Sequence, residues 1–297
     1  MSANKIERVG VLGTGLMGSG IVQVCAQAGY TVIAREIEEE YWKKAFDKIG
    51  GYLQKAVDKE KISDQDRQAA LDRMSGTTQL DDLRDCDLII EAVVEDIEIK
   101  NRMFVELDEI CPEHTIFASN TSSLTVVEMA AATSRPDRVV GLHFFNPVPI
   151  MKLVEVVRAI TTSSETFDTA WEFAQSVGKT PIAAKDNSGF VVNLLLVPYL
   201  LGAVRALGNG VASIGDIDKG MMFGCGHPMG PLTLLDFVGI DTTYRIAEIM
   251  FDEYKQEVYA APPLLRKMHL AGYHGRKVGR GFYDYSGEKP VPMDLNL

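Results

Sequence analysis

The chain has 297 residues, of which 46% are hydrophobic and 24% charged, and it carries a formal net charge of -11 at pH 7. This length and composition are typical of a globular protein with two domains and argue against a nucleic-acid-binding protein, because phosphate backbones require clustered Lys and Arg. The N-terminus lacks an apolar signal region, and no apolar run is long enough to span a bilayer. We therefore expect a cytoplasmic protein with neither nucleic acid nor membrane as a partner.

The cysteines and histidines predict no metal site. The four cysteines are far apart and form no C-x-x-C pair, so we expect free thiols rather than a zinc site or a redox motif. His269 and His274 lie close in sequence but have no carboxylate pair at ligand spacing, and we interpret them as surface or structural residues.

The first recognisable unit is a short β-branched strand at 8–12, a glycine-rich loop and an apolar helix at 19–28. In such a loop the first glycine permits a tight turn, the second lets a pyrophosphate approach the backbone, and the third lets the helix pack on the strand. We expect the cofactor to contact Gly13, Gly15, Leu16, Met17 and Gly18. The alternative is a glycine-rich turn that serves packing alone.

A second strand at 31–35 ends at Glu36, where a dinucleotide-binding unit needs an acid to accept hydrogen bonds from the adenosine ribose. A carboxylate there repels a 2′-phosphate and favours NAD over NADP. The adjacent Arg35 leaves NADP open, because a guanidinium can pair with that phosphate.

Residues 38–74 are charged and predict an inserted pair of amphipathic helices, the second of them capped by Ser63. The lysines of this segment form either a solvated face or a binding face for a phosphorylated substrate handle. They include Lys44, Lys48, Lys55, Lys59 and Lys61.

Apolar strands recur at 87–92, 115–119 and 139–145 with helical stretches between them, which predicts a doubly wound, mainly parallel sheet of the Rossmann type. Ligands bind beyond the carboxyl ends of such strands. Polar clusters occupy these ends: Glu91 and Glu95, the run 119–123, and His143 with Asn146. The serines of that run could instead cap a helix that starts near Thr125.

The segment from His143 to Val156 is where we expect the chemistry. Pro147 and Pro149 forbid a helix and turn the chain back, which would bring Glu155 to His143. A carboxylate that orients an imidazole makes a general base near neutral pH. The alternative is a satisfied core histidine.

The remaining chain predicts a helix at 165–177, a last strand at 180–184 and a polar hinge at 185–189. We place the domain boundary there, which makes 1–185 the nucleotide-binding domain and 186–297 an all-α domain. The helix expected at 190–207 is apolar nearly all round, a pattern that favours a dimer interface. Further helices are expected at 216–222, 232–237 and 242–254, and a loose tail at 288–297.

The chain resembles the L-3-hydroxyacyl-CoA dehydrogenase family, including its 3-hydroxybutyryl-CoA members, over nearly its whole length. The matching motifs, in order, are VGVLGTGLMGSGI, CDLIIEAVVED, ASNTSSL, GLHFFNPVPIMKLVEV, GFVVN, HPMGPLTLLDFVG and GRKVGRGFYDY. The resemblance implies reversible oxidation of a (3S)-3-hydroxyacyl-CoA to a 3-ketoacyl-CoA by NAD, in fatty-acid or butanoate metabolism. It also implies an α-helical second domain that forms a homodimer.

Carried over by position, the resemblance implies that His143 is the base and Glu155 its orienting carboxylate. Ser122 and Asn193 would polarise and bind the substrate. The same comparison implies cofactor contacts and one contact with CoA. The cofactor contacts would be Glu95, Lys100, Ser122, Asn146 and Lys277, and the CoA contact would be Lys59.

Four positions depart from the family pattern. Glu36 replaces the usual Asp, Ser188 a Pro, Leu194 an Arg beside Asn193, and Tyr52 a small polar residue. Two alternatives to the leading function follow: a dehydrogenase of a related hydroxy acid that needs no CoA, and a non-catalytic relative similar to the lens crystallins of this family.

Overall fold

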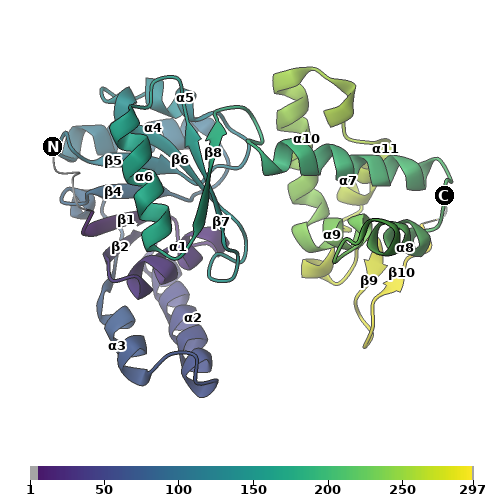
Figure 1. The fold of residues 1–297 in the computed structure, drawn as a ribbon, viewed down its shortest axis with the longest axis horizontal. Coiled ribbons are helices and arrows are strands. Elements are labelled where there is room, and N and C mark those ends of the chain that lie inside the picture. Colours follow the sequence, from purple (N-terminus) through teal and green to yellow (C-terminus); the bar gives the residue numbers. More distant parts are fainter. Residues whose placement is uncertain (1–5, 296–297) are drawn as a thin grey trace. The chain divides into compact units, whose positions relative to one another are not determined.

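The computed structural model describes residues 6–295, and the chain divides into two compact units, Met1–Phe190 and Val191–Leu297 (Figure 1). The division falls after the 185/186 boundary expected from the sequence, because residues 186–190 pack on the first unit. The Asp186 carboxylate accepts hydrogen bonds from the amides of Val126 and Val127, and Ser188 Oγ donates to the Ser123 carbonyl.

The first unit is built on an eight-stranded sheet (Figure 1). Its strands are β1 (Arg8–Leu12), β2 (Thr31–Arg35), β3 (Met74–Thr77), β4 (Leu88–Glu91), β5 (Ile116–Ser119), β6 (Val139–Phe144), β7 (Leu153–Arg158) and β8 (Thr180–Lys185). The order across the sheet is β3-β2-β1-β4-β5-β6-β7-β8, and every neighbouring pair is parallel except β6 and β7. The expected doubly wound, mainly parallel sheet is confirmed.

Helices cover both faces of this sheet. They are α1 (Leu16–Gln27), α2 (Glu39–Asp58), α3 (Asp64–Asp72), α4 (Ile97–Ile110), α5 (Val126–Ala131) and α6 (Ser164–Ser176). Two apolar cores result: one joins α1, α2, α3 and α6 to one face, and the other joins α4 and α5 to the opposite face. Strand residues alternate between the two cores, as the period of a β-strand requires.

Two strands were not predicted from the sequence. β3 is a short polar edge strand, MSGT, whose Gly76 accommodates the Trp42 ring: a Cβ at Gly76 would lie 2.1 Å from Trp42 Cδ2. β7 was read only as an apolar segment, because Glu155 interrupts it. β3 depends on its pairing with β2, which is distant in sequence, and local pattern does not reveal such a partner. β7 pairs with β6, the strand directly before it.

The second unit is a helical domain of α7 (Val192–Gly208), α8 (Ile214–Cys225), α9 (Pro231–Val238), α10 (Ile240–Tyr254) and α11 (Pro263–Leu270). The expected helical second domain is confirmed, but the expectation of a loose tail from residue 288 was wrong in part. β9 (Tyr283–Asp284) pairs antiparallel with β10 (Val291–Pro292), so part of the expected tail is ordered. None of the helices within residues 6–295 is long and apolar enough to cross a membrane.

Candidate active site

His143 and Glu155 face each other across the antiparallel pair of β6 and β7. The register pairs these two residues directly, so their side chains leave the sheet on the same face. His143 Nδ1 lies 2.6 Å from Glu155 Oε2, and the two residues are 6% and 0% exposed. An ionised carboxylate accepts the Nδ1 proton, which leaves Nε2 as the basic nitrogen of the neutral ring.

Two phenylalanine rings enclose the imidazole, and the sequence pointed to neither of them. The Phe145 and Phe190 ring centroids lie 4.5 Å and 5.6 Å from that of His143. Phe190 is buried and has a left-handed backbone, with φ 49°. A bulky residue adopts the left-handed backbone conformation only where the surrounding structure stabilises it, and such residues concentrate at functional sites.

Glu95 organises the loop that carries Ser122. Its Oε1 accepts hydrogen bonds from the Thr121 hydroxyl, from the Ser122 amide at 3.2 Å and from Ser123 Oγ at 3.3 Å. Burial opposes ionisation of this carboxyl group, but the Lys100 ammonium and these hydrogen bonds together hold the pKa of Glu95 below its usual value. Glu95 is therefore a charged anchor for the loop after β5.

Lys100 lies inside the protein, with 1% of its surface exposed. Its Nζ is 2.7 Å from Glu91 Oε1 and 3.1 Å from Glu95 Oε2, and Glu91 Oε2 accepts a 2.6 Å hydrogen bond from Ser119 Oγ. Lys100 thus acts on the site through the two carboxylates beside it. Asn120 adds a link that the sequence did not single out, because its Oδ1 accepts the amide proton of Phe144, next to His143.

The glycine-rich loop has the backbone geometry that a pyrophosphate requires. Gly13 has φ 84°, and a Cβ on Gly18 would lie 1.8 Å from the Gly13 carbonyl oxygen, so neither position tolerates a side chain. A Cβ on Gly15 would meet no atom within 4 Å, which leaves open space at the N-terminus of α1, next to Leu16 and Met17. These residues fit a dinucleotide on the helix dipole.

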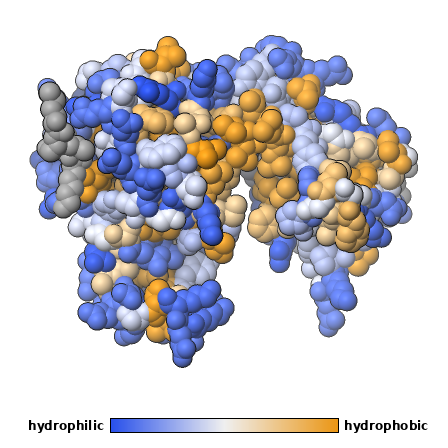
Figure 2. Space-filling view, viewed as in Figure 1, coloured by the Kyte–Doolittle hydropathy of each residue, from blue (hydrophilic) through white to orange (hydrophobic). Residues whose placement is uncertain are grey.

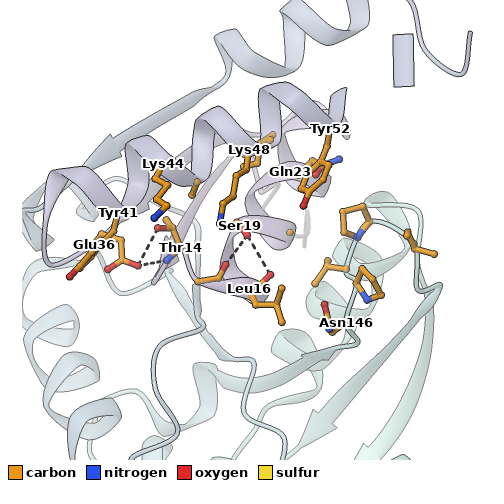
Figure 3. Close-up of a pocket in the computed structure, with 18 residues that line it drawn as sticks. Thr14, Leu16, Ser19, Gln23, Glu36, Tyr41, Lys44, Lys48, Tyr52 and Asn146 are labelled. Carbon is orange, nitrogen blue, oxygen red and sulfur yellow. Dashed lines mark hydrogen bonds between the residues drawn. The ribbon is translucent and has the colours of Figure 1, made fainter. Parts of the chain in front are cut away.

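Glu36 sits at the end of β2, beside this loop. Its Oε1 accepts hydrogen bonds from the Thr14 amide at 2.5 Å and the Thr14 hydroxyl at 3.1 Å (Figure 3). Arg35 is engaged elsewhere, because its Nε donates to the Thr78 carbonyl at 3.3 Å.

A cavity of about 680 Å³ opens between α1, α2 and the loop that follows β6 (Figure 3). One wall is α2, which contributes Tyr41, Lys44, Lys48 and Tyr52. The opposite wall is residues 146–150, and the cavity also reaches Glu36. Lys59 is exposed at the end of α2 and does not line it.

Two of the expected site residues belong to the second unit. Asn193 is half-buried in the first turn of α7, and Leu194 follows it. Lys277 is half-exposed, and its Nζ lies 2.6 Å from Asp241 Oδ2. This ammonium group therefore has an anionic partner within its own unit.

A Rossmann-type nucleotide-binding unit with a buried histidine–carboxylate pair near the carboxyl ends of its strands defines a nucleotide-dependent dehydrogenase. Residues 8–187 match the family model "3-hydroxyacyl-CoA dehydrogenase, NAD binding domain", and residues 189–285 match "3-hydroxyacyl-CoA dehydrogenase, C-terminal domain". The chain belongs to the 3-hydroxyacyl-CoA dehydrogenase family.

Similar proteins cover the whole chain. It is 48% identical to a 3-hydroxybutyryl-CoA dehydrogenase of Mycobacterium tuberculosis, over 95% of this chain and 100% of that protein. It is 43% identical to the human mitochondrial hydroxyacyl-coenzyme A dehydrogenase, over 96% and 93%. The crystal structure of (S)-3-hydroxybutyryl-CoA dehydrogenase from Ralstonia eutropha has a TM-score of 0.92 at 42% identity, over 95% and 100%. The expected family and the NAD-dependent dehydrogenase class are confirmed.

Proposed function

We propose that this chain catalyses the reversible oxidation of a (3S)-3-hydroxyacyl-CoA, such as 3-hydroxybutyryl-CoA, to the 3-ketoacyl-CoA, with NAD as the oxidant. The observation that carries the proposal is the buried 2.6 Å pair of His143 and Glu155 in a chain of this family. When bound, NAD supplies the acceptor for the hydride that leaves C3 of the substrate.

His143 is the general base of this mechanism. Its Nε2 takes the proton of the 3-hydroxyl group, and the imidazolium that forms is stabilised by the Glu155 carboxylate at Nδ1. In the reverse direction the same Nε2 proton is returned to the oxygen. Burial of the pair strengthens this electrostatic stabilisation, because little water screens it.

Ser122 and Asn193 are the substrate-polarising residues of the proposal. Hydrogen bonds from their side chains would be directed at the oxygens on which charge develops, the reacting oxygen and the thioester carbonyl. Ser122 lies on the loop that Glu95 anchors, while Asn193 belongs to the second unit.

The nucleotide contacts complete the proposal. The N-terminus of α1 receives the pyrophosphate and Glu36 the adenosine ribose, while Glu95, Lys100, Ser122, Asn146 and Lys277 are the further cofactor residues. Preference for NAD over NADP is supported by the Glu36 charge and by the engagement of Arg35 with Thr78. Lys44 and Lys48 line the same cavity as Glu36 and supply positive charge for the phosphates of a bound nucleotide or CoA. Lys59 remains a candidate CoA contact outside that cavity.

A steady-state assay tests the proposed activity. Acetoacetyl-CoA and a longer 3-ketoacyl-CoA would be offered with NADH and, separately, with NADPH, and acetoacetate without CoA would serve as the matched control. We expect turnover of the thioesters with NADH, weaker use of NADPH, and little turnover without CoA. Equal turnover of acetoacetate would favour the hydroxy-acid alternative, and NADH binding without any turnover would favour a crystallin-like relative.

We also propose that the chain works in the cytoplasm as a homodimer joined through its second unit. Large apolar side chains are exposed there, among them Leu195 at 70%, Val211 at 72% and Phe223 at 80%. Figure 2 shows hydrophobic surface in orange on this unit as well as on the first. Soluble monomers rarely leave such surface uncovered. Light scattering coupled to gel filtration would measure the mass, and a monomer at micromolar concentration would contradict the dimer.

A further inference from the structure

Lys179, the residue before β8, carries a buried ammonium group that the proposed mechanism does not use. The residue is 9% exposed. Its Nζ donates hydrogen bonds to the backbone carbonyls of Val148 and Met151, the latter at 2.9 Å. Among residues 6–295 no carboxylate pairs with it, so its partners are backbone dipoles.

A buried cation without a counter-ion is costly unless its protons are bonded, and hydrogen bonds from an ammonium are stronger than neutral ones. Burial indeed lowers the pKa of Lys179. The two carbonyl groups must therefore stay in place for this charge to be tolerated. Conversely, the ammonium group ties two points of one loop to the start of β8.

That loop, residues 145–152, joins the strand of His143 to the strand of Glu155 and forms a wall of the cavity (Figure 3). The amides of Ile150 and Met151 both donate to the Pro147 carbonyl at 2.9 Å. On its other side the loop packs on α1, where a Cβ added to Gly20 would lie 2.7 Å from Val148 Cβ. The loop is thus held between α1 and Lys179.

We propose that Lys179 is a positioning residue that holds loop 145–152 against α1. It thereby shapes the wall of a cavity that the proposed cofactor residues Glu36 and Asn146 also line. The proposal rests on the proposed function for its kinetic consequence, while the tether itself is independent of it. The His143–Glu155 pair has separate support, because the paired backbones of β6 and β7 set its register. Loss of the ammonium group should therefore weaken the binding of NADH and substrate far more than the chemical step.

Kinetics of the Lys179→Met variant test this separation. Methionine keeps an unbranched side chain but removes all three donors. We therefore expect KM for NADH to rise about tenfold or more, and KM for acetoacetyl-CoA to rise with it, while kcat changes by less than about threefold. Lys179→Arg retains a buried cation with several donors and should restore KM to within about threefold of wild type. Lys267→Met, at an exposed position of α11 in the second unit, is the matched control and should behave as wild type.

Hydrogen exchange of the folded protein measures the tether without any substrate. In Lys179→Met the amides of Ile150 and Met151 should exchange about tenfold faster or more, with the β6–β7 amides unchanged. If the wild-type protein shows no turnover, the proposed function is rejected. The exchange measurement would still test the tether, because it needs no substrate.

Any one of three results for Lys179→Met would overturn the role of Lys179. They are unchanged exchange at both amides, an unchanged KM, and a loss of kcat at wild-type KM. Should Lys179→Met fail to fold, Lys179→Gln, which keeps a polar end group but removes the charge, decides by the same exchange measurement. Faster exchange at Ile150 and Met151 in that variant supports the tether, and wild-type exchange with wild-type KM rejects it.

Discussion

At the scale of single residues, the site depends on the pairing of His143 with Glu155, which the register of β6 and β7 creates. His143 and Glu155 are 12 residues apart in sequence and directly opposite in the sheet. A slip of one residue would send one of the two side chains to the opposite face. The antiparallel turn in an otherwise parallel region of the sheet therefore assembles the base.

Substitutions of this pair should affect the chemical step. In His143→Ala the base is lost, and in Glu155→Gln the imidazolium loses its stabilising charge, so we expect kcat to fall by roughly two orders of magnitude or more in each case. Initial-rate measurements with acetoacetyl-CoA and NADH check this. His114→Ala, which removes a half-exposed histidine of the same unit, is the control and should keep wild-type kcat. Unaltered kcat in His143→Ala would remove the mechanism.

At the scale of elements, α5 is capped from a residue distant in the chain. Thr125 precedes the helix without a side-chain cap, and Ser122 and Ser123 do not cap it either. The amides of Val126 and Val127 instead donate to the two oxygens of Asp186, both at 2.7 Å. The alternative that the serine run caps this helix was wrong, because that run is bonded to Glu95.

Removal of this cap should destabilise the first unit. Asp186→Ala leaves two helix amides without their acceptor, and we expect the free energy of unfolding to fall by about 1–3 kcal/mol. Urea denaturation followed by the fluorescence of Trp42 and Trp171, both in this unit, measures the change. Asp168→Ala, on the exposed side of α6, should alter stability by less than about 0.5 kcal/mol. An equal loss in the two variants would reject the capping role.

At the scale of the whole molecule, a buried carboxyl group in the second unit makes its stability depend on pH. The second unit buries Asp236, whose carboxylate accepts hydrogen bonds from the amides of Phe282 and Tyr283 and so holds the segment before β9. Burial, together with the charge of Asp218, raises the pKa of Asp236 to about 6 against these hydrogen bonds. The folded state consequently binds a proton more tightly than the unfolded state, where the pKa is near 3.8.

This shift predicts that the second unit gains stability as the pH falls through about 6 toward 4. Between pH 7 and pH 5 the gain from Asp236 is about 1.4 kcal/mol, because roughly one pH unit of that range lies below the folded pKa. Hydrogen exchange at the amides of Phe282 and Tyr283, corrected for intrinsic rates, should slow by about tenfold. Asp236→Asn should lack this dependence, and a wild type without it would contradict the assignment.

The sequence by itself determined the nucleotide-binding unit, because a strand, a glycine-rich loop, a helix and Glu36 follow one another within a short stretch and carry local physical requirements. It also determined the division into an α/β unit and a helical one, since hydrophobic periodicity is a local property. The position of His143 at a strand end followed from the same patterns.

Only the tertiary structure decided which distant groups meet. The sequence predicted that Glu155 would meet His143, and the register of β7 places the two side chains 2.6 Å apart. It did not reveal that Phe190 packs on the imidazole, that Asp186 accepts the first amides of α5, or that Lys179 ties loop 145–152 to the start of β8. Lys100 was expected as a cofactor contact, but its side chain lies buried between the carboxylates of Glu91 and Glu95. Such contacts depend on packing between segments far apart in sequence, which neither periodicity nor motif spacing encodes.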